Sequence, residues 1–155
     1  MQSLGLNYRA IVIGSTGTIG AGFVAALRQD PYCALVVEVS RRNIPGFALE
    51  DEASIAAAAT QCALQGPFQL IIDATGALTL DGHGPEKSLG ALNEQNMLRH
   101  MQVNAISPLL LLRSFAPLLK NPKMEWNHPT LTTYQFKNHS LTDGRYRYTW
   151  YGGKA

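Results

Sequence analysis

The residues best suited to chemistry are three glycines at three-residue spacing near the N-terminus. Glycine permits a tight turn and lets the backbone approach a bound pyrophosphate closely. No Gly-Lys-Ser/Thr sequence follows, so the run is not a phosphate loop of the ATPase type. The pattern predicts a nucleotide-binding loop, with an ordinary strand-to-helix turn as the alternative. The candidate cofactor-binding residues of this loop are Gly14, Ser15, Thr16, Gly17, Thr18, Ile19 and Gly20.

Two adjacent arginines, Arg41 and Arg42, directly follow a second apolar run. In a unit of two parallel strands joined by a helix, this point lies beside the adenosine ribose of a bound dinucleotide. An acidic residue there bonds the 2′-hydroxyl of NAD, whereas an arginine accommodates the 2′-phosphate of NADP. The pair therefore favours NADP over NAD as the cofactor. The alternative is that both arginines are merely solvated.

Apolar runs rich in β-branched residues provide the elements that must position these groups. We expect buried parallel strands over 9–13, 34–40 and 69–73. The stretch 43–51 contains proline and glycine, so we expect a loop with at most a short strand. After the third strand, small residues would let a ligand approach the backbone. These further candidate cofactor-binding residues are Ala74, Thr75 and Gly76.

Helical spacing of apolar residues separates the expected strands. It predicts a first helix ending near Gln29, a second over about 51–65, and a long helical stretch over about 92–119 with a kink or break near Pro108. The expected core face of the long stretch is Met97, Met101, Ala105, Leu109, Leu112 and Leu119. The alternation predicts a Rossmann-like, doubly wound α/β fold with a parallel sheet between two helical layers.

Composition limits the classes of partner. The chain has 155 residues and a formal charge of +2, which gives no reason to expect nucleic acid or an anionic surface as a partner. The longest apolar stretch is too short to span a bilayer, and no signal peptide is recognisable. Two cysteines, Cys33 and Cys62, are expected to be buried free thiols, and no metal-ligand spacing occurs. We expect a cytoplasmic protein whose partner is a small molecule, with no nucleic acid, membrane or metal.

Three motifs in this order resemble the short-chain dehydrogenase/reductase family. The glycine loop over 13–20 is similar to its cofactor loop, Asp73-Ala74-Thr75-Gly76 to its Asn-Asn-Ala-Gly motif, and 101–108 to its Val-Asn helix motif. Pro85-Glu86-Lys87-Ser88-Leu89 resembles the bacterial C-factor-like branch. The resemblance covers about residues 8 to 120, and one departure is Ala48, where the family has an aspartate that meets adenine.

The resemblance implies NADP-dependent hydride transfer between nicotinamide and a carbonyl or alcohol substrate. In the family, the residue matching Asn104 helps to hold a water in a proton relay, and a serine, a tyrosine and a lysine complete the catalytic set. The lysine lowers the pKa of the tyrosine, which is otherwise too high for acid–base work at neutral pH.

Residues 121–155 depart from the family pattern. They contain no valine or isoleucine, although the family has a buried strand here that carries its catalytic serine. Tyr151 and Lys154 are three residues apart rather than four, and Thr132 stands in for the serine. The candidate catalytic residues are therefore Asn104, Thr132, Tyr151 and Lys154, with a tail that lacks any catalytic role as the favoured alternative for the last three.

The abrupt change in composition suggests a reductase sequence that is truncated or frameshifted after about residue 120. We expect a dinucleotide-binding domain over 1–120, incomplete at its C-terminal side, and an atypical tail over 121–155 with an edge strand at 130–136. Three functions remain open: an NADP-dependent oxidoreductase, a dinucleotide-binding module that lacks catalysis, and a subunit that completes its sheet with another chain. An unpaired sheet edge would also favour a homo-oligomer.

Overall fold

The computed structural model describes residues 4–84, 86–120, 139–140 and 146–147. Three parallel strands form its central sheet: β1 (Tyr8–Ile13), β2 (Cys33–Val39) and β3 (Leu70–Asp73), in the order β2-β1-β3. These strands confirm the three predicted segments to within one residue at each end. The chain moves from β1 to one side for β2 and then crosses to the other side for β3. In open α/β sheets, ligands bind outside the carboxyl ends of the strands at such a reversal of strand order, which here lies between β1 and β3.

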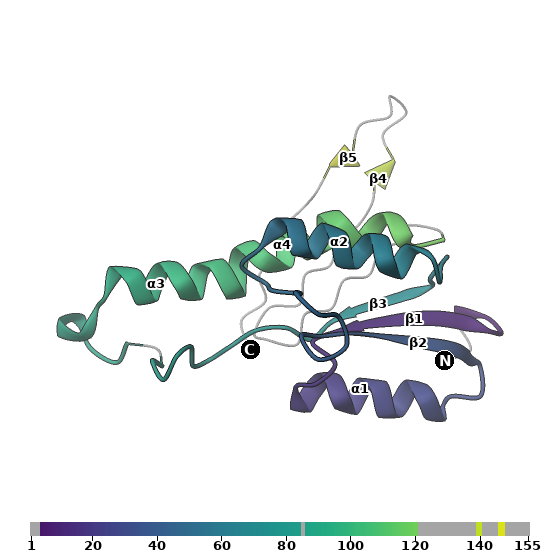
Figure 1. Ribbon diagram of the computed structural model, residues 1–155, viewed down its shortest axis with the longest axis horizontal. Helices are drawn as coiled ribbons and strands as arrows, with labels where there is room; N and C mark the ends of the chain where they lie inside the picture. The colour runs from purple at the N-terminus through teal and green to yellow at the C-terminus, as the bar shows by residue number, and fades with distance from the viewer. Residues whose placement is uncertain (1–3, 85, 121–138, 141–145, 148–155) are drawn as a thin grey trace.

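Helices cover both faces of the sheet, which confirms the predicted three-layer Rossmann-like arrangement. Helix α1 (Thr18–Gln29) lies on one face, and α2 (Glu52–Ala63) and α4 (Ser107–Phe115) lie on the other (Figure 1). Asp51 caps α2 by accepting a hydrogen bond from the Ala53 N–H. An acidic N-cap satisfies a free N–H group and complements the helix dipole, which explains why α2 begins there.

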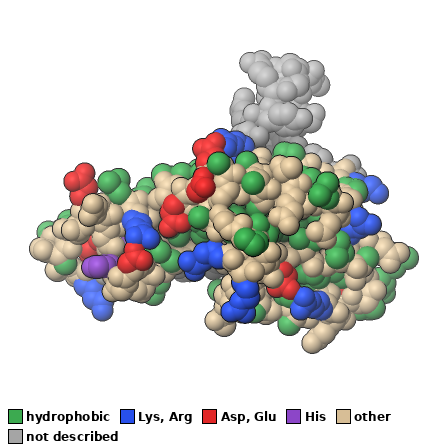
Figure 2. Space-filling model, viewed as in Figure 1, with side chains coloured by type: hydrophobic (Ala, Val, Ile, Leu, Met, Phe, Trp, Pro, Cys, Tyr) green, Lys and Arg blue, Asp and Glu red, His purple; other side chains and the backbone are tan. Residues whose placement is uncertain are grey.

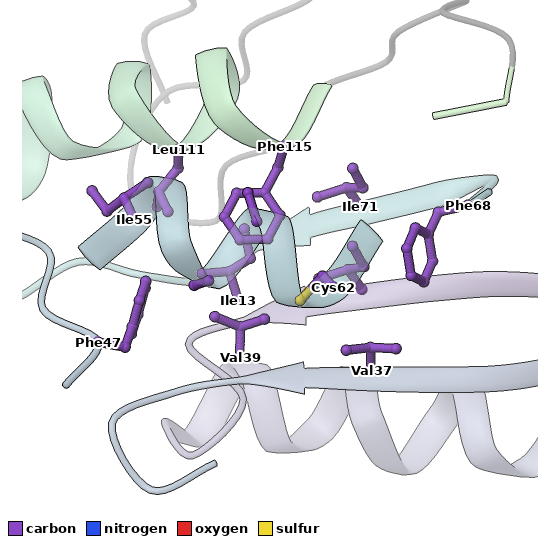
Figure 3. Close-up of a cluster of buried hydrophobic side chains, with 13 residues drawn as sticks. Ile13, Val37, Val39, Phe47, Ile55, Cys62, Phe68, Ile71, Leu111 and Phe115 are labelled. Carbon is purple, nitrogen blue, oxygen red and sulfur yellow. The ribbon is translucent and has the colours of Figure 1, made fainter. Parts of the chain in front are cut away.

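Strand β1 divides its side chains between two hydrophobic clusters, as alternation in a strand with two covered faces requires. Ile13 lies with Ile55 of α2 and with Leu111 and Phe115 of α4 in the larger cluster (Figure 3). Ile11 belongs to the same cluster. On the α1 face the buried members are Tyr8, Ala10, Val12, Val24, Leu27 and Ile72. The burial of both faces explains why β1 reads as a nearly continuous apolar run.

The chain begins to extend the sheet beyond β3 near the end of the main described segment. The N–H of Phe68 donates to the carbonyl of Leu118 at 3.0 Å, and the N–H of Lys120 donates to the carbonyl of Phe68 at 2.8 Å. Phe68 and Leu119 form a parallel bridge. The predicted edge strand at 130–136 lies outside the described residues, as does most of the expected tail. Within the tail, the structure describes the antiparallel pair β4 (His139–Ser140) and β5 (Tyr146–Arg147).

The predicted long helix is several helical pieces. A short 3₁₀ turn, η2 (Leu89–Ala91), precedes α3 (Glu94–Met101), which continues as a π-helix, η3 (Gln102–Ile106), into α4 and a final 3₁₀ turn, η4 (Ala116–Leu118). Pro108 has no N–H to donate to the carbonyl four residues earlier. The Ser107 N–H instead bonds the carbonyl of Gln102, five residues back. The predicted irregularity near Pro108 is confirmed, and its form is a π-helix.

The predicted core face of this stretch is partly wrong. Leu112 and Leu119 pack against the core, but Met97, Met101 and Leu109 are exposed. Helix α3 extends past the carboxyl ends of the strands, so the sheet does not lie beneath it (Figure 1). The observed buried face is Val103, Ser107, Leu111 and Phe115. The polar Ser107 obscures this four-residue repeat; its hydroxyl lies 2.6 Å from the carbonyl oxygen of Leu49 and 2.7 Å from that of Gln102.

Candidate functional site

The glycine loop lies where the carboxyl ends of all three strands meet. Gly14 has a φ of +80°, a conformation that glycine adopts without strain. Its N–H donates to the carbonyl of Val39, at the end of β2, at 2.8 Å. On the other side, the Ala74 N–H donates to the carbonyl of Ile13, at the end of β1, at 2.8 Å. Backbone hydrogen bonds thus connect the loop after β1 with β2 and with the loop after β3.

The three glycines of the loop are needed for different reasons. A Cβ on Gly14 would lie 2.7 Å from the carbonyl oxygen of Ala74, and a Cβ on Gly20 would overlap the carbonyl oxygen of Gly14. Both glycines are therefore required by packing within the chain itself. A Cβ on Gly17 would lie 3.4 Å from the Gly14 carbonyl oxygen, which is an ordinary contact distance. Packing within the described residues does not explain Gly17.

Gly17 is also the N-cap of α1, with φ −72° and ψ 160°. No side chain caps this helix, and its first turn contains no acidic residue. Thr16, Thr18 and Ile19 are exposed around the same helix end. The first N–H groups of a helix lack partners within the helix and lie at the positive end of its dipole. This end of α1 thus has the properties of an anion-binding site.

The remaining polar side chain of the loop, that of Ser15, does not face solvent, because Ser15 is only 3% exposed. Its hydroxyl donates to Oδ1 of Asn43 at 3.3 Å. The same oxygen also accepts a hydrogen bond from the Ser40 hydroxyl. Arg41 and Arg42 lie between these two partners in an exposed turn. Among the described residues, neither guanidinium group has a hydrogen bond or ion pair.

Side-chain hydrogen bonds hold the conformation of the loop after β3. Asp73 is 1% exposed, and its Oδ1 accepts from both the N–H of Thr75 at 2.9 Å and the hydroxyl of Thr75 at 2.6 Å. Thr75 is itself buried, while Gly76 is exposed with a φ of +139°. The chain therefore turns sharply at Gly76. Within the predicted segment 74–76, Gly76 is the exposed residue.

Asn104, the candidate from the helix motif, binds the same loop from the side of the π-helix. Its Oδ1 accepts from the N–H of Ala77 at 2.8 Å, and its Nδ2 donates to the carbonyl of Ala77 at 2.9 Å. The Nδ2 atom also lies 3.4 Å from Nδ1 of His100, one turn earlier in the helix. Asn104 thus acts as a two-point clamp between the π-helix and the loop that follows β3.

Asn104 is the candidate catalytic residue that falls within the described part of the chain. Thr132, Tyr151 and Lys154 lie outside the described residues, so their catalytic role stays a prediction. Two residues that hold the site together were not among the predicted site residues, namely Asp73 and Asn43. Each has a local signal: Asp73 stands two residues before Thr75, and Asn43 stands three residues after Ser40, as in turns closed by short polar side chains.

Positive and negative side chains are interspersed over the face of the molecule seen in Figure 2. Ion pairs on the described surface include Arg28–Glu38 at 2.5 Å and Arg113–Glu52 at 2.5 Å. No helix in the described residues is long and apolar enough to cross a membrane. Near the candidate site, the exposed charged residues that directly follow β2 are Arg41 and Arg42.

Known structures resemble this arrangement. A short-chain dehydrogenase from Burkholderia cenocepacia in complex with NADP matches with a TM-score of 0.63 and 22% identity, over 79% of this chain and 52% of that one. NADPH-bound carbonyl reductase from chicken fatty liver matches with a TM-score of 0.61 and 23% identity, over 73% and 48%. A variant of a Serratia marcescens short-chain dehydrogenase/reductase matches with a TM-score of 0.62 and 18% identity, over 81% and 58%.

The chain spans about half the length of the solved structures that it matches. No protein-family model matches the chain, and no curated protein matches it. The likeness is therefore one of fold. It confirms the predicted resemblance at that level: this chain has the fold of part of a short-chain dehydrogenase/reductase.

Proposed function

We propose that this chain binds NADP(H) at the carboxyl ends of β1, β2 and β3, as the cofactor-binding part of a short-chain oxidoreductase. The observation that carries the proposal is Gly17. Gly14 and Gly20 are explained by packing within the chain, whereas the space beside Gly17 borders an uncapped helix N-terminus. A pyrophosphate that approaches this helix end would explain both the missing side chain and the missing cap.

The preference for NADP rests on Arg41 and Arg42. Both follow β2 directly and lie in an exposed turn that is hydrogen-bonded to the glycine loop through Asn43. The described residues leave both guanidinium groups free to bind an anion. A 2′-phosphate on the adenosine ribose is the anion expected at this position of the fold. The chicken and Burkholderia structures named above contain NADPH and NADP, respectively.

The proposed reaction is hydride transfer between nicotinamide and a carbonyl or alcohol carbon. The bound cofactor would supply or accept the hydride. The clamp on Ala77 lets Asn104 hold the loop after β3 in a fixed position, close to the carboxyl ends of the strands. In the proton relay that the family resemblance implies, Asn104 would help to hold a water through its backbone and side chain.

A dinucleotide-binding module that lacks catalysis is the second candidate. The observation that favours it is in the sequence. Tyr151 and Lys154 are three residues apart rather than four, which departs from the spacing of the tyrosine and lysine in the family pattern. Turnover of NADPH with a panel of aldehydes and ketones distinguishes the two candidates.

Calorimetric titration of the purified chain with NADPH and with NADH tests the cofactor proposal. Saturable binding that is tighter for NADPH is the expected result. No binding of either dinucleotide by a folded sample contradicts the proposal.

Substitution of Gly17 separates binding from stability. Gly17→Asp supplies a favourable N-cap and an acid at the positive end of α1, so we expect the free energy of unfolding to rise by about 0.5 kcal/mol. The same carboxylate would repel a pyrophosphate, so NADPH binding should fall at least about tenfold. Gly17→Asn is the matched control, because it caps the helix without adding charge. Unchanged NADPH binding in Gly17→Asp would show that the helix end does not hold the cofactor.

A further inference from the structure

The hydrogen bonds of Asn43 join two loops that come from different strands. Its Oδ1 accepts from the hydroxyl of Ser15, 28 residues earlier, and from the hydroxyl of Ser40, three residues earlier. Ser15 and Ser40 are 3% and 4% exposed, so both bonds are shielded from water on the serine side. A polar contact at this depth is specific, because an unpaired buried hydroxyl carries a desolvation penalty.

The turn that contains Asn43 is ordered by the same residues. The N–H of Asn43 donates to the carbonyl of Ser40 at 3.1 Å, and the N–H of Ile44 donates to that carbonyl at 2.9 Å. The N–H of Arg42 donates to the Ser40 hydroxyl at 3.3 Å. The backbone that carries Arg41 and Arg42 is therefore closed on itself. Its side-chain link to the glycine loop is the bond between Asn43 and Ser15.

We infer that Asn43 is a positioning residue for cofactor selectivity, which latches the arginine turn to the glycine loop. The inference rests on the proposed NADP(H) site and deepens it. In the proposed site, the glycine loop would hold the pyrophosphate, and the turn that carries Arg41 and Arg42 would hold the 2′-phosphate. Asn43 fixes the distance and orientation between these two parts of the site. A charge-assisted contact to a phosphate depends on such geometry more than a contact to a ribose hydroxyl does.

The latch predicts a selective effect on binding. Loss of the Asn43–Ser15 bond lets the arginine turn move relative to the glycine loop while the strands and α1 keep their packing. Affinity for NADPH should then fall, and affinity for NADH should be nearly unchanged, because NADH lacks the 2′-phosphate. A residue that merely supports the fold would lower both affinities together. The ratio of the two affinities is therefore the informative measurement.

The test is calorimetric titration of the full chain with NADPH and NADH for wild type, Asn43→Ala, Ser15→Ala and the double variant. We expect each single variant to lower the NADPH-to-NADH affinity ratio about fivefold, the effect of one lost hydrogen bond. The double variant should lower it by about the same factor, because both substitutions break the same Asn43–Ser15 contact. Thr60→Ala is the control, since the hydroxyl of Thr60 bonds the carbonyl of Ala56 within α2, away from both loops.

Each outcome has a distinct meaning. Equal losses for both cofactors, an unchanged ratio, or additive effects in the double variant would overturn the latch while leaving the NADP(H) site intact. If Asn43→Ala does not fold, the ratio measured for Ser15→Ala decides alone, because that variant leaves the turn's own hydrogen bonds in place. Failure of the folded wild type to bind either dinucleotide would overturn the proposed function, and the latch with it.

Discussion

The two loops of the candidate site, after β1 and after β3, are held in place by different kinds of contact. The loop after β1 is fixed by backbone contacts: Gly14 bonds the end of β2, and Gly20 packs directly against the Gly14 carbonyl. The loop after β3 is fixed mainly by side chains, through Asp73 on Thr75 and Asn104 on Ala77. Closely packed backbone atoms leave no space for an added side chain. The loss of one side-chain hydrogen bond, by contrast, lowers stability only by the contribution of that bond.

This difference explains why one loop is easier to recognise in the sequence than the other. Close backbone approach demands glycine itself, so the first loop carries a regular glycine pattern. Polar clamps can be built from several residue types at many separations. The partner of Ala77 is 27 residues away, on a different element. Substitutions in each loop test this difference separately.

Gly20→Ala should have the largest effect, because its Cβ would overlap the carbonyl oxygen of Gly14. Backbone atoms on both sides leave no flexible group to move aside, so we expect a loss of about 3 kcal/mol or more in the free energy of unfolding. Chemical denaturation measures it. Gly22→Ala in the same helix is the control: its Cβ meets nothing within 4 Å, so it should stabilise the protein by about 0.5–1 kcal/mol. Equal stability of the two variants would contradict the backbone account.

Thr75→Val should destabilise the protein by about 2 kcal/mol, because it removes a hydroxyl donor from the buried carboxylate of Asp73. The shape of the side chain is retained, and the second bond, from the Thr75 N–H, remains. Urea unfolding provides the measurement. Thr60→Val on the exposed surface of α2 is the matched control and should stay within about 0.5 kcal/mol of wild type. A loss no larger than that of the control would mean that the carboxylate does not depend on this hydroxyl.

Asn104→Ala removes both hydrogen bonds to Ala77, but Asn104 is exposed and water can replace its groups. We therefore expect a loss of only about 1 kcal/mol in stability. Hydrogen exchange should be faster at the Ala77 amide and unchanged at the Gly14 amide, which bonds Val39. Faster exchange at both amides would show that the two loops are held as one unit rather than separately.

The smallest expected effect is a dependence on pH that is confined to the loop after β3. The hydrogen bond from Asn96, at 2.7 Å, lowers the pKa of Glu86 from its ordinary value, with a further contribution from its own backbone and the nearby His100. When folding lowers the pKa of a carboxyl group, its ionised form stabilises the folded state at pH values above the pKa of the unfolded chain. This stabilisation is lost as the pH falls through the pKa of the folded state. Acid should therefore shift the side-chain amide resonance of Asn96 while the glycine loop stays unchanged. Glu86→Gln should abolish this titration, and a transition that persists in that variant would have another origin.

The elements that depend on local rules could be predicted from the sequence. Buried strands on both sides of a sheet require continuous apolar runs, and a strand-to-helix turn with close backbone contact requires glycine at set positions. The three strands, α1, α2 and the turn from β1 into α1 follow these rules and were predicted correctly, whereas the nucleotide-binding role of the glycine loop stays a prediction. The irregularity before Pro108 also follows from a local cause, the missing N–H of proline.

The tertiary structure alone decided which polar groups meet and which apolar residues stay exposed. Ser107 is buried because the carbonyl of Leu49 lies 2.6 Å away, 58 positions earlier in the chain. Met97 and Met101 are exposed because α3 extends beyond the sheet (Figure 1). Asn43 and Asn104 acquire their roles from partners on other strands and loops. Local periodicity carries no information about such distant partners, because hydrogen bonds and burial depend on where the chain returns in space.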